Sequence, residues 1–341
     1  MNNQQKTFGV VIVTYRSGDV IEACLSSLMK MTHQPIRVLV CDNASPDDTV
    51  DIVRRWAETT GTSLAEYQSS GSEGLSYSDL RDVTIINTGG NLGYAGGVNA
   101  GLKILHRIPE IDLFWVLNPD AEPEPDTASA FAEHAAEFGE FGLMGGRILY
   151  SEELGRIQSD GGRVNPWTGQ CRNLNQGLLP DAASFPRNET LDFISGANVV
   201  ASRRFLDSVG LMKEDYFLYY EEVDWAQRRG ELKLTVAPKA VVHHIGGTAI
   251  GSGAVGRLAS PFATYFNFRN RMRFVRRFHP WSLPTAGTFA ALKIGQLLLA
   301  RAYPEAYAAL RGTLQLSPPS GVAKILPQDA RELAFGRAGR N

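Results

Sequence analysis

The chain has 341 residues, of which 43% are hydrophobic and 21% charged. This composition excludes wholesale disorder, and the length suits two domains or one large α/β domain with an appendage. The three cysteines, Cys24, Cys41 and Cys171, exclude a disulfide scaffold and lack zinc-type spacing, so we expect reduced thiols. The first residues lack the basic region and cleavage site of a signal peptide, which favours a cytoplasmic protein.

Charge is distributed unevenly along the chain. From Arg257 to the end there are 13 Lys and Arg against 3 Asp and Glu, whereas residues 1–256 hold 21 bases and 33 acids. A basic tail on an acidic body predicts a surface that meets an anionic partner. Nucleic acid and anionic lipid are both candidates, because arginines alternate with aromatic side chains between Phe262 and Phe278.

The first 120 residues repeat a short apolar run, a polar cluster and a helical stretch. The runs are almost continuously apolar, as in parallel strands that helices cover on both faces. They are Phe8–Tyr15, Ile36–Cys41, Val83–Ile86 and Leu113–Leu117. After the second run we expect a helix capped by Ser45 with Pro46 in its first position, and then a long loop over Thr60–Asp82. The alternation predicts an open α/β sheet.

The middle of the chain has shorter elements. Arg156–Leu179 is rich in Gly, Asn and Gln and predicts irregular or antiparallel structure, and strands are expected at Asp192–Ala201 and Leu232–Val242. Tyr219–Arg229 predicts a helix in which the side chains of Asp224 and Arg228 pair at i,i+4.

Beyond Gly251 the pattern becomes helical. The Phe262–Phe278 segment carries the arginines and aromatic residues of the basic tail. The apolar stretch Leu283–Ala300 contains Lys293 and is barely the ~20 residues needed to cross a bilayer, so we expect it to lie in the membrane interface.

Polar clusters follow each of the four predicted parallel strands. Ligands of open α/β sheets bind outside the carboxyl ends of the strands, so four clusters on one edge predict a binding site. The clusters are Thr14-Tyr15-Arg16-Ser17, Asp42-Asn43-Ala44-Ser45, Asn87 to Gly97, and Asn118-Pro119-Asp120. The sequence lacks the glycine patterns of dinucleotide and P-loop sites. An Asp, a glycine-rich turn and a carboxylate for a diphosphate-bound cation fit a sugar-nucleotide better than a dinucleotide.

Five ordered motifs carry a family resemblance. VIVTYRSGD, VCDNASPDDT, NTGGNLGYAGGVNAG, LNPDAEPEPD and FLYYEEVDWAQR resemble the motifs of family 2 inverting glycosyltransferases with a GT-A fold, over Phe8 to Gly247. The similarity is greatest to the rhamnosyltransferase-like branch that works on cell-surface polysaccharides. It implies a GT-A domain over 1–255, with a nucleotide-sugar half (1–120) and an acceptor and catalytic-base half (121–255), and a basic helical extension over 256–341.

The same resemblance assigns residues to the donor site. Asp42 would contact the base, and Asp120 stands where the metal-binding DxD motif of the family ends. Asn118 replaces the first Asp of that motif, so binding of Mg²⁺ or Mn²⁺ should be weaker and strict metal dependence is open. His243 matches a histidine that some relatives use as a further metal ligand. The residues implied to bind the nucleotide-sugar are Thr14, Tyr15, Arg16, Asp42, Asn91, Gly93, Tyr94, Asn118 and Asp120.

The Glu221-Glu222 pair falls where the family carries a Glu-Asp pair whose second member is the general base. A carboxylate can deprotonate the acceptor hydroxyl, especially if burial beside Glu221 and Asp224 raises the pKa of Glu222. Glu222, Glu221 and Asp224 are therefore the candidate catalytic residues. The candidate acceptor residues are Gly196, Ala197, Asn198 and Trp225.

Structural explanations compete with each assignment. Asp42 and Asp120 are also typical helix caps in short βα loops. The acidic residues at 221–224 would also suit a solvated helix face, His243 a structural role at a strand end, and Ser195–Asn198 a tight turn.

The leading hypothesis is transfer of a sugar, by resemblance L-rhamnose from dTDP-rhamnose, to a lipid-linked or polysaccharide acceptor. The donor could equally carry UDP, because the sequence does not fix the base. A sugar-phosphate nucleotidyltransferase and a non-catalytic sugar- or lipid-binding protein are the alternatives. For the basic tail, peripheral contact with an anionic membrane on its cytoplasmic face is favoured over nucleic acid.

Overall fold

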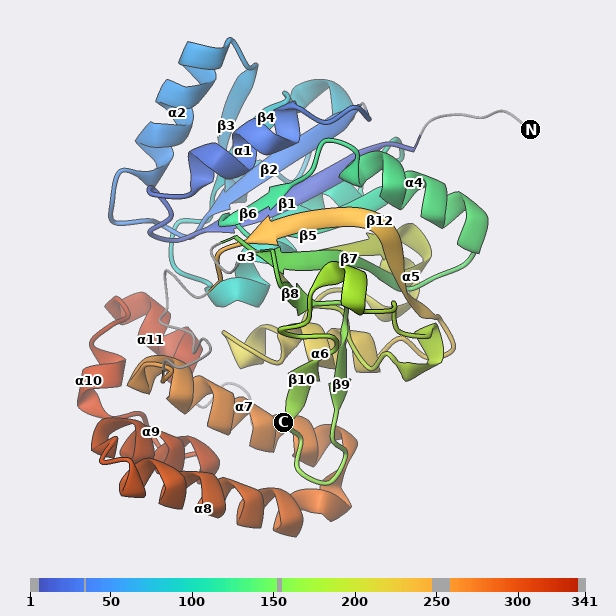
Figure 1. The fold of residues 1–341 in the computed structure, drawn as a ribbon. Helices are drawn as coiled ribbons and strands as arrows, with labels where there is room; N and C mark the ends of the chain where they lie inside the picture. Colours follow the sequence, from blue (N-terminus) through green and yellow to red (C-terminus); the bar gives the residue numbers. More distant parts are fainter. Residues whose placement is uncertain (1–5, 34, 152–154, 247–257, 337–341) are drawn as a thin grey trace.

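A mixed sheet forms the centre of the molecule. The computed structural model describes residues 6–33, 35–151, 155–246 and 258–336, and within them ten strands form one sheet in the order β3-β4-β2-β1-β5-β11-β7-β12-β6, with β8 paired to β7 (Figure 1). The strands are β1 Phe8–Thr14, β2 Ile36–Asp42, β3 Leu64–Gln68, β4 Val83–Asn87, β5 Leu113–Leu117, β6 Ala121–Pro123, β7 Leu143–Tyr150, β8 Ile157–Ser159, β11 Asn198–Ser202 and β12 Leu234–His244. A separate hairpin joins β9 Gly162–Val164 to β10 Cys171–Asn173.

Strands β3, β4, β2, β1 and β5 are parallel to their neighbours, and β11 then enters the sheet antiparallel between β5 and β7. This confirms the predicted open, mostly parallel α/β sheet. Because β11 pairs directly with β5, the two predicted halves of the domain share one sheet. The predicted boundary at 255/256 lies outside the described residues.

Helices cover both faces of the sheet. Alternate residues of β1 belong to different cores: Phe8, Val10 and Ile12 pack on one face, and Val11 and Val13 on the other. The first face is covered by α1 Ile21–Met29, α2 Thr49–Thr60 and α4 Thr127–Phe138, and the second by α3 Gly93–His106, α5 Arg203–Val209 and α6 Glu221–Gln227. Burial on both faces explains why these strands read as continuous apolar runs.

Two local predictions for the amino-terminal half of the chain are wrong. The predicted loop Thr60–Asp82 contains the edge strand β3, whose half-exposed LAEYQ sequence has no apolar run. Helix α2 begins at Thr49 rather than after Ser45, because the Ser45 hydroxyl donates to Asp42 instead of capping the helix.

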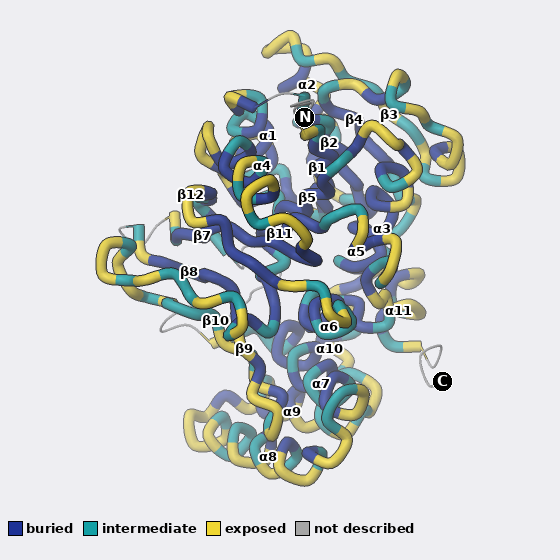
Figure 2. Tube along the Cα trace, turned by 90° about the vertical axis from the view of Figure 1, so that its right-hand side faces the viewer, coloured by how far each residue is buried: buried dark blue, intermediate teal, exposed yellow. Residues whose placement is uncertain are grey.

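Five helices at the carboxyl end gather at one end of the molecule, beside the sheet domain (Figures 1 and 2). They are α7 Pro261–Phe278, α8 Leu283–Leu299, α9 Tyr303–Thr313, α10 Ser320–Ala323 and α11 Gln328–Phe335. No helix of the described residues is long and apolar enough to span a membrane.

The arginines of α7 face the protein. Arg269 is 2% exposed and donates to the Tyr216 carbonyl at 2.7 Å, and Arg277 contacts Asp224 at 2.5 Å and Asp215 at 3.2 Å. Arg271 and Arg273 also bond to neighbouring side chains. Arg276 and Arg277 are the exposed members of this set, and Arg277 is held by its two carboxylate partners. Four of the five arginines that the sequence assigned to a surface for an anionic partner are therefore engaged within the protein.

Candidate active site

The four polar clusters lie together at the carboxyl edge of the sheet. Parallel register places Thr14 opposite Asp42, and Asp42 opposite Asn87. The Thr14 hydroxyl donates to Asp42 Oδ1 at 2.8 Å, and the Thr88 hydroxyl donates to the Asp42 carbonyl at 2.8 Å. The structure therefore brings three of the clusters into direct contact through Asp42.

Asp42 is buried and already accepts several hydrogen bonds. Besides Thr14, the backbone N–H and hydroxyl of Ser45 donate to its carboxylate at 2.9 and 2.6 Å. The Asp42 carboxylate thus fixes the loops that follow β1 and β2. Nearby, Arg16 is exposed with a positive φ of 56°, and its guanidinium lies 5.7 Å from the Tyr15 ring centroid.

The glycine-rich turn bridges to a distant loop. Gly93 has a φ of 73°, and a Cβ there would lie 2.4 Å from the Phe217 carbonyl oxygen, so only glycine fits. Asn91 Oδ1 accepts from the Gly93 N–H at 3.0 Å, and the Tyr94 N–H donates to the Phe217 carbonyl at 2.8 Å. The predicted donor loop is therefore joined to the segment that precedes helix α6.

Tyr94 connects the donor loop to the predicted acceptor turn. Its hydroxyl donates to the Gly196 carbonyl at 2.6 Å, and burial raises the pKa of Tyr94 well above its usual range. A Cβ on Gly196 would lie 3.4 Å from the Tyr94 hydroxyl and 3.6 Å from Glu222 Cβ. Gly196 therefore separates the tyrosine from the candidate base.

Three residues with positive φ place the two glutamates. Phe217, Tyr219 and Tyr220 have φ values of 64°, 68° and 75°, which is uncommon for non-glycine residues and marks a constrained segment. Helix α6 begins directly after them, with Glu221 and Glu222 in its first turn.

The two glutamates differ in exposure. Glu221 is 3% exposed, and its Oε2 has no hydrogen-bond partner among the described residues, whereas Glu222 is partly exposed. Burial raises the pKa of both carboxyls, and the charge of Glu222 raises that of Glu221 further. A carboxylate with a raised pKa and a partly exposed position is suited to accept a proton from a bound hydroxyl.

Asp120 and His244 lie close together at the carboxyl ends of β5 and β12. His244 Nε2 lies 3.0 Å from Asp120 Oδ1 and 3.2 Å from Asn118 Nδ2, and His244 Nδ1 lies 2.6 Å from Gln158 Oε1. Burial alone would raise the pKa of Asp120, but its contacts with His244 and the Gly246 N–H lower the pKa below its ordinary value.

The histidine beside Asp120 is not the predicted one. Adjacent residues of a strand point to opposite faces, and His243 instead lies with Nε2 3.1 Å from Glu124 Oε1, half-exposed. His244 therefore replaces His243 in the candidate metal site. Among the described residues no third His, Cys, Asp or Glu completes a metal-binding cluster with this pair.

Three predicted site residues point into the protein instead. Asp224 is fully buried and binds Arg228, Arg277 and the Tyr216 hydroxyl, so it is an anchor between helices; its predicted i,i+4 pair with Arg228 is confirmed at 2.7 Å. Asn198 accepts from the Trp115 indole at 2.8 Å in the core. Trp225 is also fully buried, with its indole bound to the Gly210 carbonyl.

Sequence reasoning did not single out Asn270, which holds the segment before α6. Its Nδ2 donates to the carbonyls of Tyr216, Leu218 and Tyr219 at 2.9, 2.7 and 3.0 Å. The sequence shows here only an amide side chain within a predicted helix. That pattern does not reveal partners more than 50 residues away.

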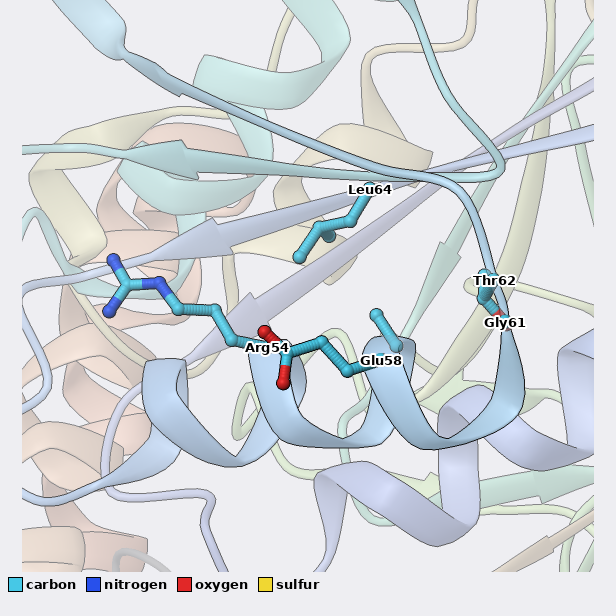
Figure 3. Close-up of a pocket in the computed structure, with 6 residues that line it drawn as sticks. Arg54, Glu58, Gly61, Thr62 and Leu64 are labelled. Carbon is cyan, nitrogen blue, oxygen red and sulfur yellow. The ribbon is translucent and has the colours of Figure 1, made fainter.

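A surface hollow of about 400 Å³ lies elsewhere, at the end of helix α2 (Figure 3). It is lined by Arg54, Glu58, Gly61, Thr62 and Leu64, and Arg54 is already paired with Glu66 at 2.8 Å. Since α2 starts after the carboxyl end of β2, its last turn lies toward the opposite edge of the sheet. This hollow is therefore separate from the candidate site.

Comparisons with known proteins agree with the fold and the motifs. The model of the family "Glycosyl transferase family 2" matches residues 9–208. The chain is 29% identical over 263 residues to N-acetylglucosaminyl-diphospho-decaprenol L-rhamnosyltransferase of Mycobacterium tuberculosis, covering 69% of this chain and 75% of that protein. It is 25% identical over 240 residues to the low-salt glycan biosynthesis hexosyltransferase Agl10 of Haloferax volcanii, covering 69% and 74%.

A solved structure shares the fold. The mannosyltransferase PcManGT of Pyrobaculum calidifontis, in complex with GDP-Man and Mn²⁺, superposes with a TM-score of 0.51 at 17% identity, over 92% of this chain and 88% of that one.

Proposed function

Because this chain belongs to glycosyl transferase family 2, we propose that it transfers L-rhamnose from dTDP-rhamnose to a lipid-linked acceptor, with inversion at the anomeric carbon. Family membership makes the chain a glycosyltransferase and removes the nucleotidyltransferase alternative. The choice of sugar and acceptor is supported by the relative whose name specifies an L-rhamnosyltransferase acting on a diphospho-decaprenol. A UDP-sugar donor and a polysaccharide acceptor are the competing choices.

The observation that carries this proposal is the position of Glu222 beside Gly196, whose carbonyl accepts from Tyr94 of the glycine-rich loop. The donor binds along the Thr14, Asp42 and glycine-loop edge, and the acceptor enters beside Gly196 and Ala197. Glu222 takes the proton of the acceptor hydroxyl as the oxygen bonds to the anomeric carbon. The sugar–diphosphate bond breaks on the opposite face, which inverts the configuration and releases the nucleoside diphosphate.

We propose that Asp120 and His244 hold a divalent cation, Mg²⁺ or Mn²⁺, together with the donor. The fit is one carboxylate and one imidazole that lie 3.0 Å apart and would offer an oxygen and a nitrogen ligand. When bound, the ion neutralises charge on the departing diphosphate. Mn²⁺ accompanies GDP-Man in the structural neighbour, which supports this assignment.

We also propose that the enzyme acts as a peripheral protein on the cytoplasmic face of the membrane. A lipid-linked acceptor would confine the reaction to the bilayer surface, and the nucleotide-sugar would reach it from the aqueous side.

The proposal is tested by incubating the purified chain with a panel of dTDP-, UDP- and GDP-sugars and a detergent-dispersed polyprenyl-diphosphate sugar. Transfer from dTDP-rhamnose alone, with a product anomer opposite to that of the donor, supports it. Preference for another donor contradicts the sugar assignment, and a retained anomer contradicts inversion. Donor binding without transfer to any acceptor would favour the non-catalytic alternative.

A further inference from the structure

Exposed apolar side chains concentrate on the hairpin formed by helices α8 and α9. We define the hairpin surface by the large apolar residues of this region that are 42–87% exposed. They are Leu292, Leu298, Leu299, Tyr303, Tyr307, Leu310 and Leu314. The hairpin lies at the outer end of the molecule, where exposed and buried segments alternate along the tube (Figures 1 and 2).

Helix α8 is apolar on both its inner and outer sides. Its inner side packs through Ala286 and Ala290, which are buried, with Ala290 against Phe268 of α7. Leu292 and Leu299 are seven residues apart and therefore share one side of the helix, where they are 65% and 87% exposed. A helix that only faces water would carry polar residues there.

Helix α9 repeats this arrangement. Its buried residues include Ala306, Ala309 and Gly312, and a Cβ on Gly312 would lie 2.5 Å from the Tyr265 carbonyl of α7, so this side is closely packed. The outer residues Tyr303, Tyr307, Leu310 and Leu314 follow a 4-3-4 spacing and form one continuous stripe. An apolar surface of this extent marks an interaction site.

The charge of the hairpin suits an anionic partner. Between Leu283 and Leu316 there are three cations, Lys293, Arg301 and Arg311, and one acid, Glu305. Arg301 is exposed at the turn between the helices, and Arg311 Nη1 lies 3.1 Å from the Tyr307 hydroxyl. Leucines beside tyrosines and basic residues are the composition of helices that lie in a membrane interface.

We propose that the hairpin surface docks on an anionic lipid bilayer. This inference deepens the proposed function and rests on its lipid-linked acceptor. Phe268 of α7 packs under the hairpin, and the next residues, Arg269 and Asn270, bind the carbonyls of the segment before Glu221. One helix therefore separates the docked surface from the segment that presents Glu222, which keeps the catalytic site close to a membrane-held acceptor.

The test is sedimentation of the full chain with vesicles of phosphatidylcholine alone and of phosphatidylcholine with phosphatidylglycerol, across a salt series. We expect binding to the anionic vesicles that weakens with salt, because the basic residues contribute through a screened attraction. Leu292→Ser with Leu299→Ser should reduce binding about tenfold, because each leucine loses its transfer into the interface. Lys293→Gln with Arg301→Gln should abolish the preference for anionic lipid.

The matched control is Leu178→Ser with Leu179→Ser, two leucines that are 45% and 47% exposed outside the carboxyl-terminal helices. This variant should bind vesicles like the wild type. Equal binding by the wild type and the Leu292/Leu299 variant would overturn the proposal. Failure to bind either vesicle, with a concentration-dependent dimer that the same variant abolishes, would also overturn it and assign the surface to a protein partner.

Transfer to a detergent-dispersed acceptor, measured in parallel, separates this inference from the proposed function. Intact transfer without vesicle binding contradicts docking alone. Vesicle binding without transfer from any donor contradicts the proposed function alone. If the leucine variant does not fold, the Lys293/Arg301 variant and the salt series still decide the outcome.

Discussion

At the scale of single residues, Glu221 and Glu222 are neighbours with different surroundings. Glu222 lies beside Gly196 and is partly exposed, whereas Glu221 is buried, and within the described part of the chain its Oε2 has no hydrogen-bond partner. Burial raises the pKa of Glu222, so Glu222 has a higher proton affinity than an exposed glutamate, and its charge in turn raises the pKa of Glu221.

Glu222→Gln should lower the transfer rate by roughly 10²–10⁴-fold, because the amide keeps the shape but cannot accept the proton. Donor affinity, measured by calorimetry, should stay unchanged. In the wild type, the rate should fall as pH drops through the raised pKa of Glu222, at a higher pH than for an ordinary glutamate. An active Glu222→Gln enzyme together with an inactive Glu221→Gln enzyme would identify Glu221 as the base.

Glu221→Gln should stabilise the fold at high pH. Its pKa is raised in the folded state, so the folded protein binds the proton more tightly than the unfolded chain and loses stability as pH rises from the ordinary glutamate pKa through the raised one. Removing this charge should raise Tm by about 1–2 °C at pH 8, corresponding to about 1 kcal/mol, and by much less at pH 4. Thermal unfolding at both pH values provides the measurement. A Tm difference that is the same at both would show that the buried charge is not its cause.

The two histidines of β12 form a matched pair for testing the cation site. His244→Ala removes the partner of Asp120 and should raise the Mn²⁺ concentration needed for half-maximal transfer by about tenfold or more, whereas His243→Ala should leave it near the wild-type value. Transfer rates across a Mn²⁺ titration give the result. A larger effect of His243→Ala would contradict the proposal that His244, with Asp120, holds the cation.

At the scale of elements, helix α7 holds the segment that precedes the proposed base. Asn270→Ala would remove one donor from the carbonyls of Tyr216, Leu218 and Tyr219 and should destabilise the protein by about 1–3 kcal/mol. It should also lower kcat more than it raises KM for the donor, because the segment before Glu222 loses its anchor while the donor loops keep theirs. Asn267→Ala is the control on the same helix, since Asn267 donates to the Ala263 carbonyl within α7 itself. Equal losses of kcat in the two variants would contradict a specific role for Asn270.

The sequence allowed prediction of the elements that obey a simple period, and of the motifs at their ends. The four parallel strands and helix α7 appear within one or two residues of the predicted bounds, because burial on both faces leaves an uninterrupted apolar run. Strand β3 escaped prediction because, at the edge of the sheet, LAEYQ buries neither face fully. The motif indicated where Glu221 and Glu222 lie in the chain. Which of His243 and His244 lies beside Asp120 depends instead on strand register, which a single sequence does not contain.

Roles that depend on distant partners could not be predicted either. Asp224 and Asn198 carry polar groups in conspicuous motifs, but Arg277 and Trp115 bind them from far along the chain. The arginines of α7 were predicted to bind an anionic partner because their partners within the protein also lie far along the chain. Their partners are carbonyls and carboxylates of the α6 region, which no local pattern connects to them.

At the scale of the whole molecule, the uneven charge of the chain is partly an internal match. The basic carboxyl-terminal part packs on the acidic body through Arg277, which bridges Asp215 and Asp224. The helices that follow then return toward the donor site: a Cβ on Gly90 would lie 2.8 Å from Asp329 Oδ2 of α11. The carboxyl-terminal helices are therefore in contact with both the loop before the base and the glycine-rich donor loop.

This arrangement predicts that the last two helices are needed for a working donor site. Val322, Leu326, Ala330 and Ala334 bury Phe217, and the Phe217 carbonyl accepts the Tyr94 N–H at the donor loop. A chain ending at Pro319 should therefore unfold at a lower denaturant concentration, because it exposes this cluster. At a temperature where it remains folded, it should bind the nucleotide-sugar at least several-fold more weakly. A chain ending at Gly336, which keeps both helices, is the control. Unchanged denaturation midpoint and donor affinity in the shorter chain would show that α10 and α11 are an appendage, and that the contact of Phe217 with Tyr94 persists without them.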